Sequence, residues 1–82
     1  MATKDTFKQL DSGDKILFND RKEPMTVTGG YDRRGRSELV LARSSRGKRY
    51  QLMSDQGKEK VIATPFGRDE KRKVKNLRIV NR

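Results

Sequence analysis

The stretch that decides the fold reads Met25-Thr-Val-Thr-Gly-Gly-Tyr31, Asp32-Arg-Arg-Gly-Arg36, Ser37-Glu-Leu-Val-Leu-Ala-Arg43, Ser44-Ser-Arg-Gly-Lys48 and Arg49-Tyr-Gln-Leu-Met53. Three runs rich in apolar residues are separated by two short loops, and each loop holds one glycine. This pattern is typical of a three-stranded antiparallel meander. Both loops also carry arginine or lysine, so the same residues predict a scaffold and a cationic surface.

Further short strands are predicted on both sides of the meander. The segment 15–18 is apolar enough to predict a first strand that is buried on both faces, and 60–64 and 77–80 predict two later strands. Met25 and Val27 alternate with threonines and are expected to point inward. The pair Gly29-Gly30 interrupts this alternation and predicts a bulge or a sharp bend.

Two short helical turns complete the expected secondary structure. The segment 3–10 predicts an N-terminal helical turn with Phe7 and Leu10 on one face, where it would cover one end of the core. Val74 and Leu77 are three residues apart, which predicts one 3₁₀ turn before the last strand. The charged segment 68–75 between these elements is expected to be a loop or an exposed helical turn.

These elements predict an all-β fold, a small antiparallel barrel of five to six strands that is closed or half-closed. The order of meander, charged loop, helical turn and last strand resembles SH3-like barrels over residues 13–80, at the level of the fold only. The resemblance implies nucleic-acid or peptide binding without selecting between them. An OB-like barrel is the close competitor. We expect an N-terminal arm over 1–12 and a single barrel domain over 13–80 that includes the basic loop 68–75.

The composition limits the functions to consider. The chain has 82 residues, of which 30% are hydrophobic and 39% charged, and it has no cysteine and no histidine. Disulfides, the usual zinc sites and cysteine or histidine triads are therefore excluded, and we expect no metal site and no cofactor. No apolar run is long enough to span a bilayer or to serve as a signal peptide. We expect a non-enzymatic protein that is cytoplasmic or nucleoid-associated and is not secreted.

The charge is unevenly distributed along the chain. There are 21 lysines and arginines against 11 acidic residues, a net charge of +10. Residues 1–41 hold 8 basic and 7 acidic residues, whereas residues 42–82 hold 13 basic and 4 acidic residues. An imbalance of this kind attracts polyanions and accelerates encounter with them.

Cations gather at both meander loops and in the segment 68–75. Arginine suits a phosphate-binding role because its planar guanidinium binds phosphate in a bidentate manner and stacks on bases. The two loops should lie at opposite ends of the meander, about 20 Å apart, and mark the ends of a basic stripe. The predicted phosphate-contacting residues are Arg33, Arg34, Arg36, Arg46, Lys48, Arg49, Arg68, Lys71, Arg72, Lys73 and Lys75.

Three aromatic residues are candidates for base stacking. Tyr31 and Tyr50 adjoin the basic loops, although a strand tyrosine more often fills the core and sends its hydroxyl to the rim. Phe66, between Pro65 and Gly67, is the aromatic residue expected to be most exposed.

We therefore predict a small β-barrel that binds DNA or RNA mainly through the phosphate backbone. The alternative is a protein-interaction module that docks an acidic partner with the same surface, as a ribosome-associated or viral accessory protein would. A metal-dependent nuclease using aspartate and glutamate is a third hypothesis, which no pair of acids in the sequence specifically favours.

Overall fold

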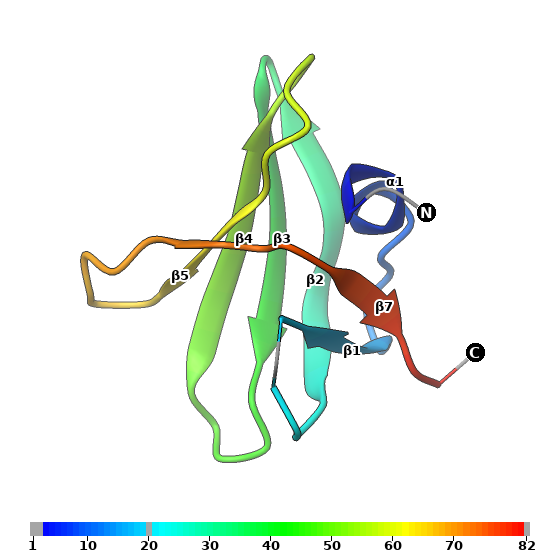
Figure 1. Ribbon diagram of the computed structural model, residues 1–82, viewed down its shortest axis with the longest axis vertical. Coiled ribbons are helices and arrows are strands. Elements are labelled where there is room, and N and C mark those ends of the chain that lie inside the picture. Colours follow the sequence, from blue (N-terminus) through cyan, green and yellow to red (C-terminus); the bar gives the residue numbers. More distant parts are fainter. Residues whose placement is uncertain (1–2, 20, 82) are drawn as a thin grey trace.

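The computed structural model describes residues 3–19 and 21–81, which form one short helix and seven strands (Figure 1). The elements are α1 (Thr3–Lys8), β1 (Lys15–Phe18), β2 (Met25–Arg34), β3 (Ser37–Arg43), β4 (Arg49–Asp55), β5 (Ile62–Pro65), β6 (Arg72–Lys73) and β7 (Leu77–Ile79). The strands form a single antiparallel sheet in the order β6-β5-β4-β3-β2-β1-β7. The predicted all-β class and the N-terminal helical turn are confirmed. The additional strand is β6, which lies inside the predicted charged loop.

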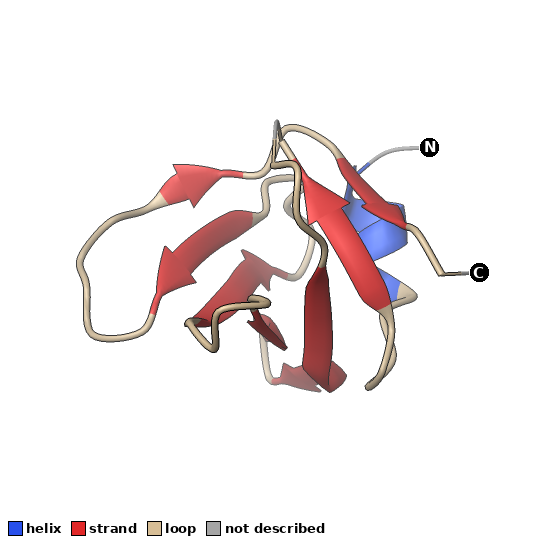
Figure 2. Cartoon of the chain, turned by 90° about the horizontal axis from the view of Figure 1, so that it is seen from below, coloured by secondary structure: helices blue, strands red, loops and turns tan. Residues whose placement is uncertain are grey.

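The sheet curls into a half-barrel, and its two edge strands are consecutive in the sequence (Figure 2). Because β6 pairs with β5 and β7 pairs with β1, the residues between them cross from one edge of the sheet to the other. The predicted 3₁₀ turn over this crossing is wrong. Val74 is buried, and its N–H donates to the Val61 carbonyl at 2.8 Å. The crossing is therefore extended, and it connects the two edge strands of the sheet.

The core lies on the inner face of the curled sheet and is completed by α1 and the segment after it. Alternating residues of neighbouring strands meet there in register, such as Val40, Leu52 and Ala63. The core consists of Phe7, Leu10, Ile16, Phe18, Met25, Val27, Val40, Ala42, Tyr50, Leu52, Val61, Ala63, Val74 and Leu77. The predicted inward positions in β2 and the packing of the helical turn are thereby confirmed.

Strand β1 differs from the prediction that both its faces are buried. Ile16 and Phe18 are buried, whereas Leu17 is only half-buried and Lys15 is exposed. Strands β2 and β7 pair with β1 on either side, but none of the elements described covers the outer face of β1. The apolar run 16–18 therefore forms a strand with one face that is partly exposed to solvent.

The predicted irregularity at Gly29-Gly30 is confirmed, although the strand continues beyond it to Arg34. The pairing of β2 with β3 shifts register on both sides of Gly29. A Cβ atom on Gly30 would lie 3.1 Å from backbone atoms of residues 10–12. The next N–H, that of Tyr31, donates to the Leu10 carbonyl at 2.8 Å. Glycine at this position allows the segment after α1 to pack directly against the sheet.

A buried polar network joins α1 to the sheet. Lys4 is 5% exposed and Glu38 is 2% exposed, and they form an ion pair. The Lys4 ammonium also donates to the Ser54 hydroxyl at 2.7 Å and to the carbonyls of Asp55 and Lys58, while the Tyr31 hydroxyl donates to the second oxygen of Glu38. Burial raises the pKa of Glu38, but the hydrogen bonds from Lys4 and Tyr31 outweigh it and hold the pKa below its ordinary value. No pattern in the sequence indicates this network.

Candidate nucleic-acid interface

The predicted cations of the two meander loops lie at opposite ends of β3, as the topology requires (Figure 1). Since β3 has seven residues, the loops are about 20 Å apart at roughly 3.3 Å per residue. At the β2–β3 turn, Gly35 adopts φ 60° and two residues make the connection. The carboxylate of Asp32, which could have capped a longer turn, instead lies 3.5 Å from Arg34. All the predicted loop cations are exposed: Arg33, Arg34, Arg36, Arg46, Lys48 and Arg49.

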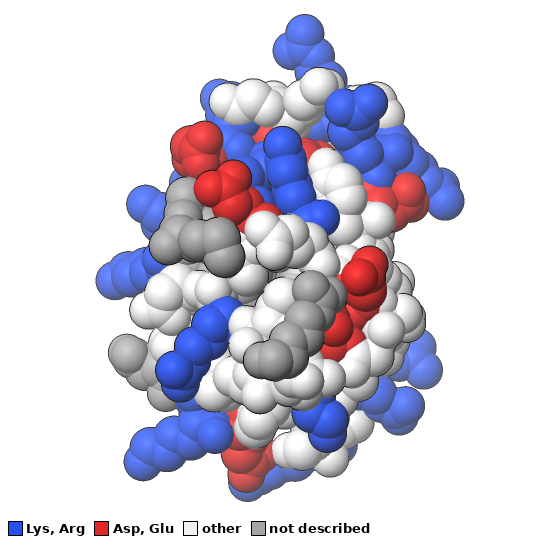
Figure 3. Space-filling model, turned by 90° about the vertical axis from the view of Figure 1, so that its right-hand side faces the viewer, with Lys and Arg blue, Asp and Glu red and all other residues white. Residues whose placement is uncertain are grey.

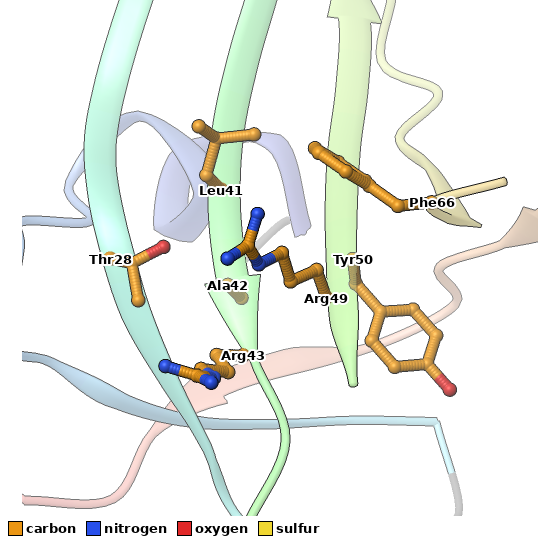
Figure 4. A pocket seen from close by; sticks show the side chains of 7 residues that line it. All are labelled: Thr28, Leu41, Ala42, Arg43, Arg49, Tyr50 and Phe66. Atoms are coloured by element: carbon orange, nitrogen blue, oxygen red, sulfur yellow. The ribbon is translucent and has the colours of Figure 1, made fainter. Parts of the chain in front are cut away.

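Lys48 and Arg49 are neighbours that point to opposite faces of the sheet. The Lys48 ammonium lies 5.5 Å from the Tyr50 ring centroid, at the end of the core. Arg49 lies on the outer face beside Leu41 and Phe66 (Figure 4). Strand alternation therefore divides this group of cations between two surfaces.

The cations of the segment 68–75 are also divided. Arg68 and Arg72 lie 4.0 and 3.6 Å from the carboxylate of Glu70, so part of their charge is balanced locally. Lys71 and Lys73 line a groove on the outer face of the sheet. Lys75 is exposed in the crossing between β6 and β7.

The three candidate aromatic residues have different environments. Tyr31 is half-buried, and its ring packs edge-on against Phe7 with centroids 5.6 Å apart. Tyr50 is 8% exposed and packs against Phe18. Phe66 is 47% exposed. Of the three, only Phe66 has an exposed side chain.

Tyr50 belongs to a cationic cluster at the end of the core. The Arg21 guanidinium lies 5.1 Å from the Tyr50 ring centroid and 5.4 Å from that of Phe18. Burial raises the pKa of the Tyr50 hydroxyl, but the hydrogen bond and charge of Arg21, together with Lys48, outweigh it and place the pKa below its ordinary value. Arg21 and Lys48 therefore interact with the Tyr50 ring at this end of the core, which leaves them less free to contact a ligand.

A groove of about 810 Å³ lies on the outer face. Its floor contains the half-buried side chains of Leu39, Met53 and Ile62, which stand side by side in register on β3, β4 and β5. Four lysines surround this floor: Lys58, Lys60, Lys71 and Lys73. An apolar strip with a cationic margin thus runs across three strands.

A second hollow, of about 250 Å³, lies at the other end of the same face. Arg43 and Arg49 stand directly opposite each other on β3 and β4 and line this hollow together with Phe66. A third hollow, which contains Leu39, Leu41 and Arg34, connects the other two across β3.

We call the surface formed by these three hollows the outer basic face. Its cations are Arg34, Arg43, Arg49, Lys58, Lys60, Lys71 and Lys73. Its acids are Asp32, Asp55 and Glu38. Glu38 is buried and paired with Lys4, and Asp32 lies beside Arg34, so most of this positive charge is uncompensated. On the side of α1 and β7, by contrast, lysines and arginines are mixed with aspartates and glutamates (Figure 3).

Three cations of the outer basic face were not among the predicted contacts. Arg43 shares the alternation phase of Leu39 and Leu41, so the sequence already indicated a common face for all three. Lys58 and Lys60 lie between β4 and β5, and no periodicity in the sequence indicates that both line the groove.

The chain matches no family model, no curated protein and no solved structure in comparisons with each. Among the residues that the structure describes, no group of three or more acidic side chains is placed to hold a metal ion. The described part of the chain also contains no helix with the length and apolar character needed to cross a membrane.

Proposed function

We propose that the protein is a non-enzymatic nucleic-acid-binding module that contacts phosphates with its outer basic face. The observation that carries this proposal is the pairing of Arg43 and Arg49. They are directly opposite residues in adjacent strands, both are exposed, and neither forms an ion pair within residues 3–19 and 21–81. Like charges directly opposite each other repel and destabilise a sheet. An anionic ligand bound between the two arginines would remove this repulsion.

The rest of the face supports a polyanion over a small anion. Its remaining lysines lie along the groove at the far end of β3 and β4, so the charge extends over about 20 Å. A chain of phosphates can contact both ends simultaneously, whereas a single small anion cannot.

The test is a fluorescence anisotropy titration of a labelled oligonucleotide at several salt concentrations. We expect micromolar or tighter binding at about 50 mM salt, and a log–log salt slope of about −0.7 to −0.9 per phosphate contact. The double variant Arg43→Glu/Arg49→Glu should weaken binding by more than about tenfold, equivalent to about 1.4 kcal/mol. It should also make the log–log salt slope shallower by at least one phosphate contact.

A matched control reverses the same amount of charge elsewhere. Lys8 and Lys22 are exposed and lie outside the three hollows. The variant Lys8→Glu/Lys22→Glu should change the affinity much less than the arginine variant. Equal losses in the two variants would show that net charge alone attracts the ligand, and no binding at low salt would refute the proposal.

The aliphatic floor of the groove favours the second candidate function, the docking of an acidic protein segment. Leu39, Met53 and Ile62 are half-buried and can contact apolar side chains between acidic ones. In this case polyglutamate or an acidic amphipathic peptide would compete with the oligonucleotide. Binding of the peptide with no binding of any oligonucleotide would establish this candidate in place of the first.

A further inference from the structure

The hollow beside Phe66 has the composition of a site for one nucleotide. It is lined by Thr28, Leu41, Ala42, Arg43, Arg49, Tyr50 and Phe66. In Figure 4, the Arg49 side chain reaches toward β3 and the Phe66 ring lies over β4 and points toward Leu41, while the Tyr50 ring points away from them. The hollow therefore combines a pair of guanidinium groups, an aromatic ring and a leucine in one small space.

Phe66 is held in place although its ring is exposed. Its N–H donates to the carbonyl of Arg49 at 3.0 Å, so the backbone of the aromatic residue is tied to that of the arginine. The preceding Pro65 is buried, and the following Gly67 turns the chain with φ 79°. Because the backbone at this position is fixed, less conformational entropy is lost when a base stacks on the ring, which is 47% exposed.

The two arginines, Arg43 and Arg49, line the hollow from directly opposite positions on neighbouring strands. The Arg43 guanidinium also lies close to Gly47, about 3.7 Å from where a Cβ atom on that residue would stand.

We infer that this hollow selects single-stranded nucleic acid, with one phosphate between Arg43 and Arg49 and the adjoining base stacked on Phe66. This inference rests on the proposed function and names its substrate class. In a duplex, the base faces are covered by their neighbours, so the ring would meet sugar and phosphate groups. A single strand can turn its bases toward Phe66 and the aliphatic floor while its phosphates remain at the cationic margin.

The first test compares an oligothymidine of about 12 nucleotides, within the usual range of roughly 4–16 for small barrels, with a duplex of equal length. The single strand should bind more tightly than the duplex. Phe66→Ala should weaken binding of the single strand by about 5- to 150-fold, the range that corresponds to the loss of one stacked base. The same variant should leave duplex binding unchanged.

Val80 provides a matched control, because it is the other large exposed apolar residue of the described chain, at 40% exposure. Val80→Ala should leave both affinities unchanged. Far-UV circular dichroism of each variant confirms that the fold is retained. Equal binding of single strand and duplex, or an equal loss of both in Phe66→Ala, would overturn the inference and leave the proposed function intact. If neither oligonucleotide binds, the proposed function itself fails.

A second test is spectroscopic and does not depend on the affinity of an alanine variant. The chain has no tryptophan, so Phe66→Trp creates a single tryptophan reporter at the site. Saturating oligothymidine should quench its emission through stacking, whereas the duplex and polyglutamate should not. Binding of the single strand without quenching would contradict stacking at this position.

Discussion

Replacing the buried Lys4 by methionine should destabilise the protein severely. The change removes the ion-pair partner of Glu38 and a donor to one hydroxyl and two carbonyl oxygens. Breaking one side of a buried pair costs about 3–5 kcal/mol. For a domain of this size, each kcal/mol lowers the melting temperature by about 4–8 °C, so we expect a decrease of roughly 12–40 °C.

The pH dependence gives this prediction a distinctive sign. In the native protein the pKa of Glu38 is below the ordinary 4.5, so its stabilising contribution is complete above pH 4.5 and is lost as the pH falls through the lowered pKa. In Lys4→Met, burial of the carboxylate is no longer outweighed, and the pKa of Glu38 should rise. Acidification toward pH 4.5 should therefore stabilise the variant, because protonation removes its unpaired buried charge.

Urea denaturation followed by circular dichroism between pH 4.5 and pH 7 measures both effects. Lys8→Met is the matched control, because Lys8 lies on the same helix and is exposed, and it should change stability by no more than about 0.5 kcal/mol. Adding Glu38→Gln to Lys4→Met should recover part of the loss and abolish the acid stabilisation. A loss below about 1 kcal/mol in Lys4→Met, or no reversal with pH, would refute the role assigned to the pair.

The two tyrosines, in a chain without tryptophan, should titrate separately in ultraviolet difference spectra. The hydrogen bond to Glu38 and burial raise the pKa of Tyr31 above 10.0, whereas Arg21 and Lys48 outweigh burial and lower that of Tyr50 below 10.0. Tyr50→Phe should remove the earlier transition alone, and a single step near pH 10 in the native protein would contradict both assignments. Gly30→Ala should cost about 1–3 kcal/mol in urea denaturation, since the added methyl meets backbone at 3.1 Å. Gly29→Ala should cost less because the atoms nearest its methyl group belong to the Leu41 side chain, with the Cβ at 3.2 Å, and the reverse order would contradict the packing of the segment 10–12. Val74→Ala should lower the free energy of unfolding by roughly 1–3 kcal/mol, because it opens a cavity where the chain crosses between the sheet edges. Lys75→Ala, on the exposed neighbour, should be near neutral, and equal effects at both positions would show that the crossing is not part of the core.

The sequence by itself determined the meander, the helical turn, the bulge at Gly29-Gly30 and the inward positions of β2. These features depend on neighbouring residues, because strand alternation and glycine turns act over a few positions. It also indicated which side chains share a face within one strand, as with Leu39, Leu41 and Arg43.

Only the tertiary structure decided which cations act together. Lys48 and Arg49 separate because the sheet has two faces, and Lys71 and Lys73 join the outer basic face because β6 pairs with β5. The pair of Lys4 and Glu38, 34 residues apart, and the extended crossing at Val74 likewise depend on long-range packing. A local pattern cannot specify such contacts, since their energy exists only once distant segments have been brought together and removed from water.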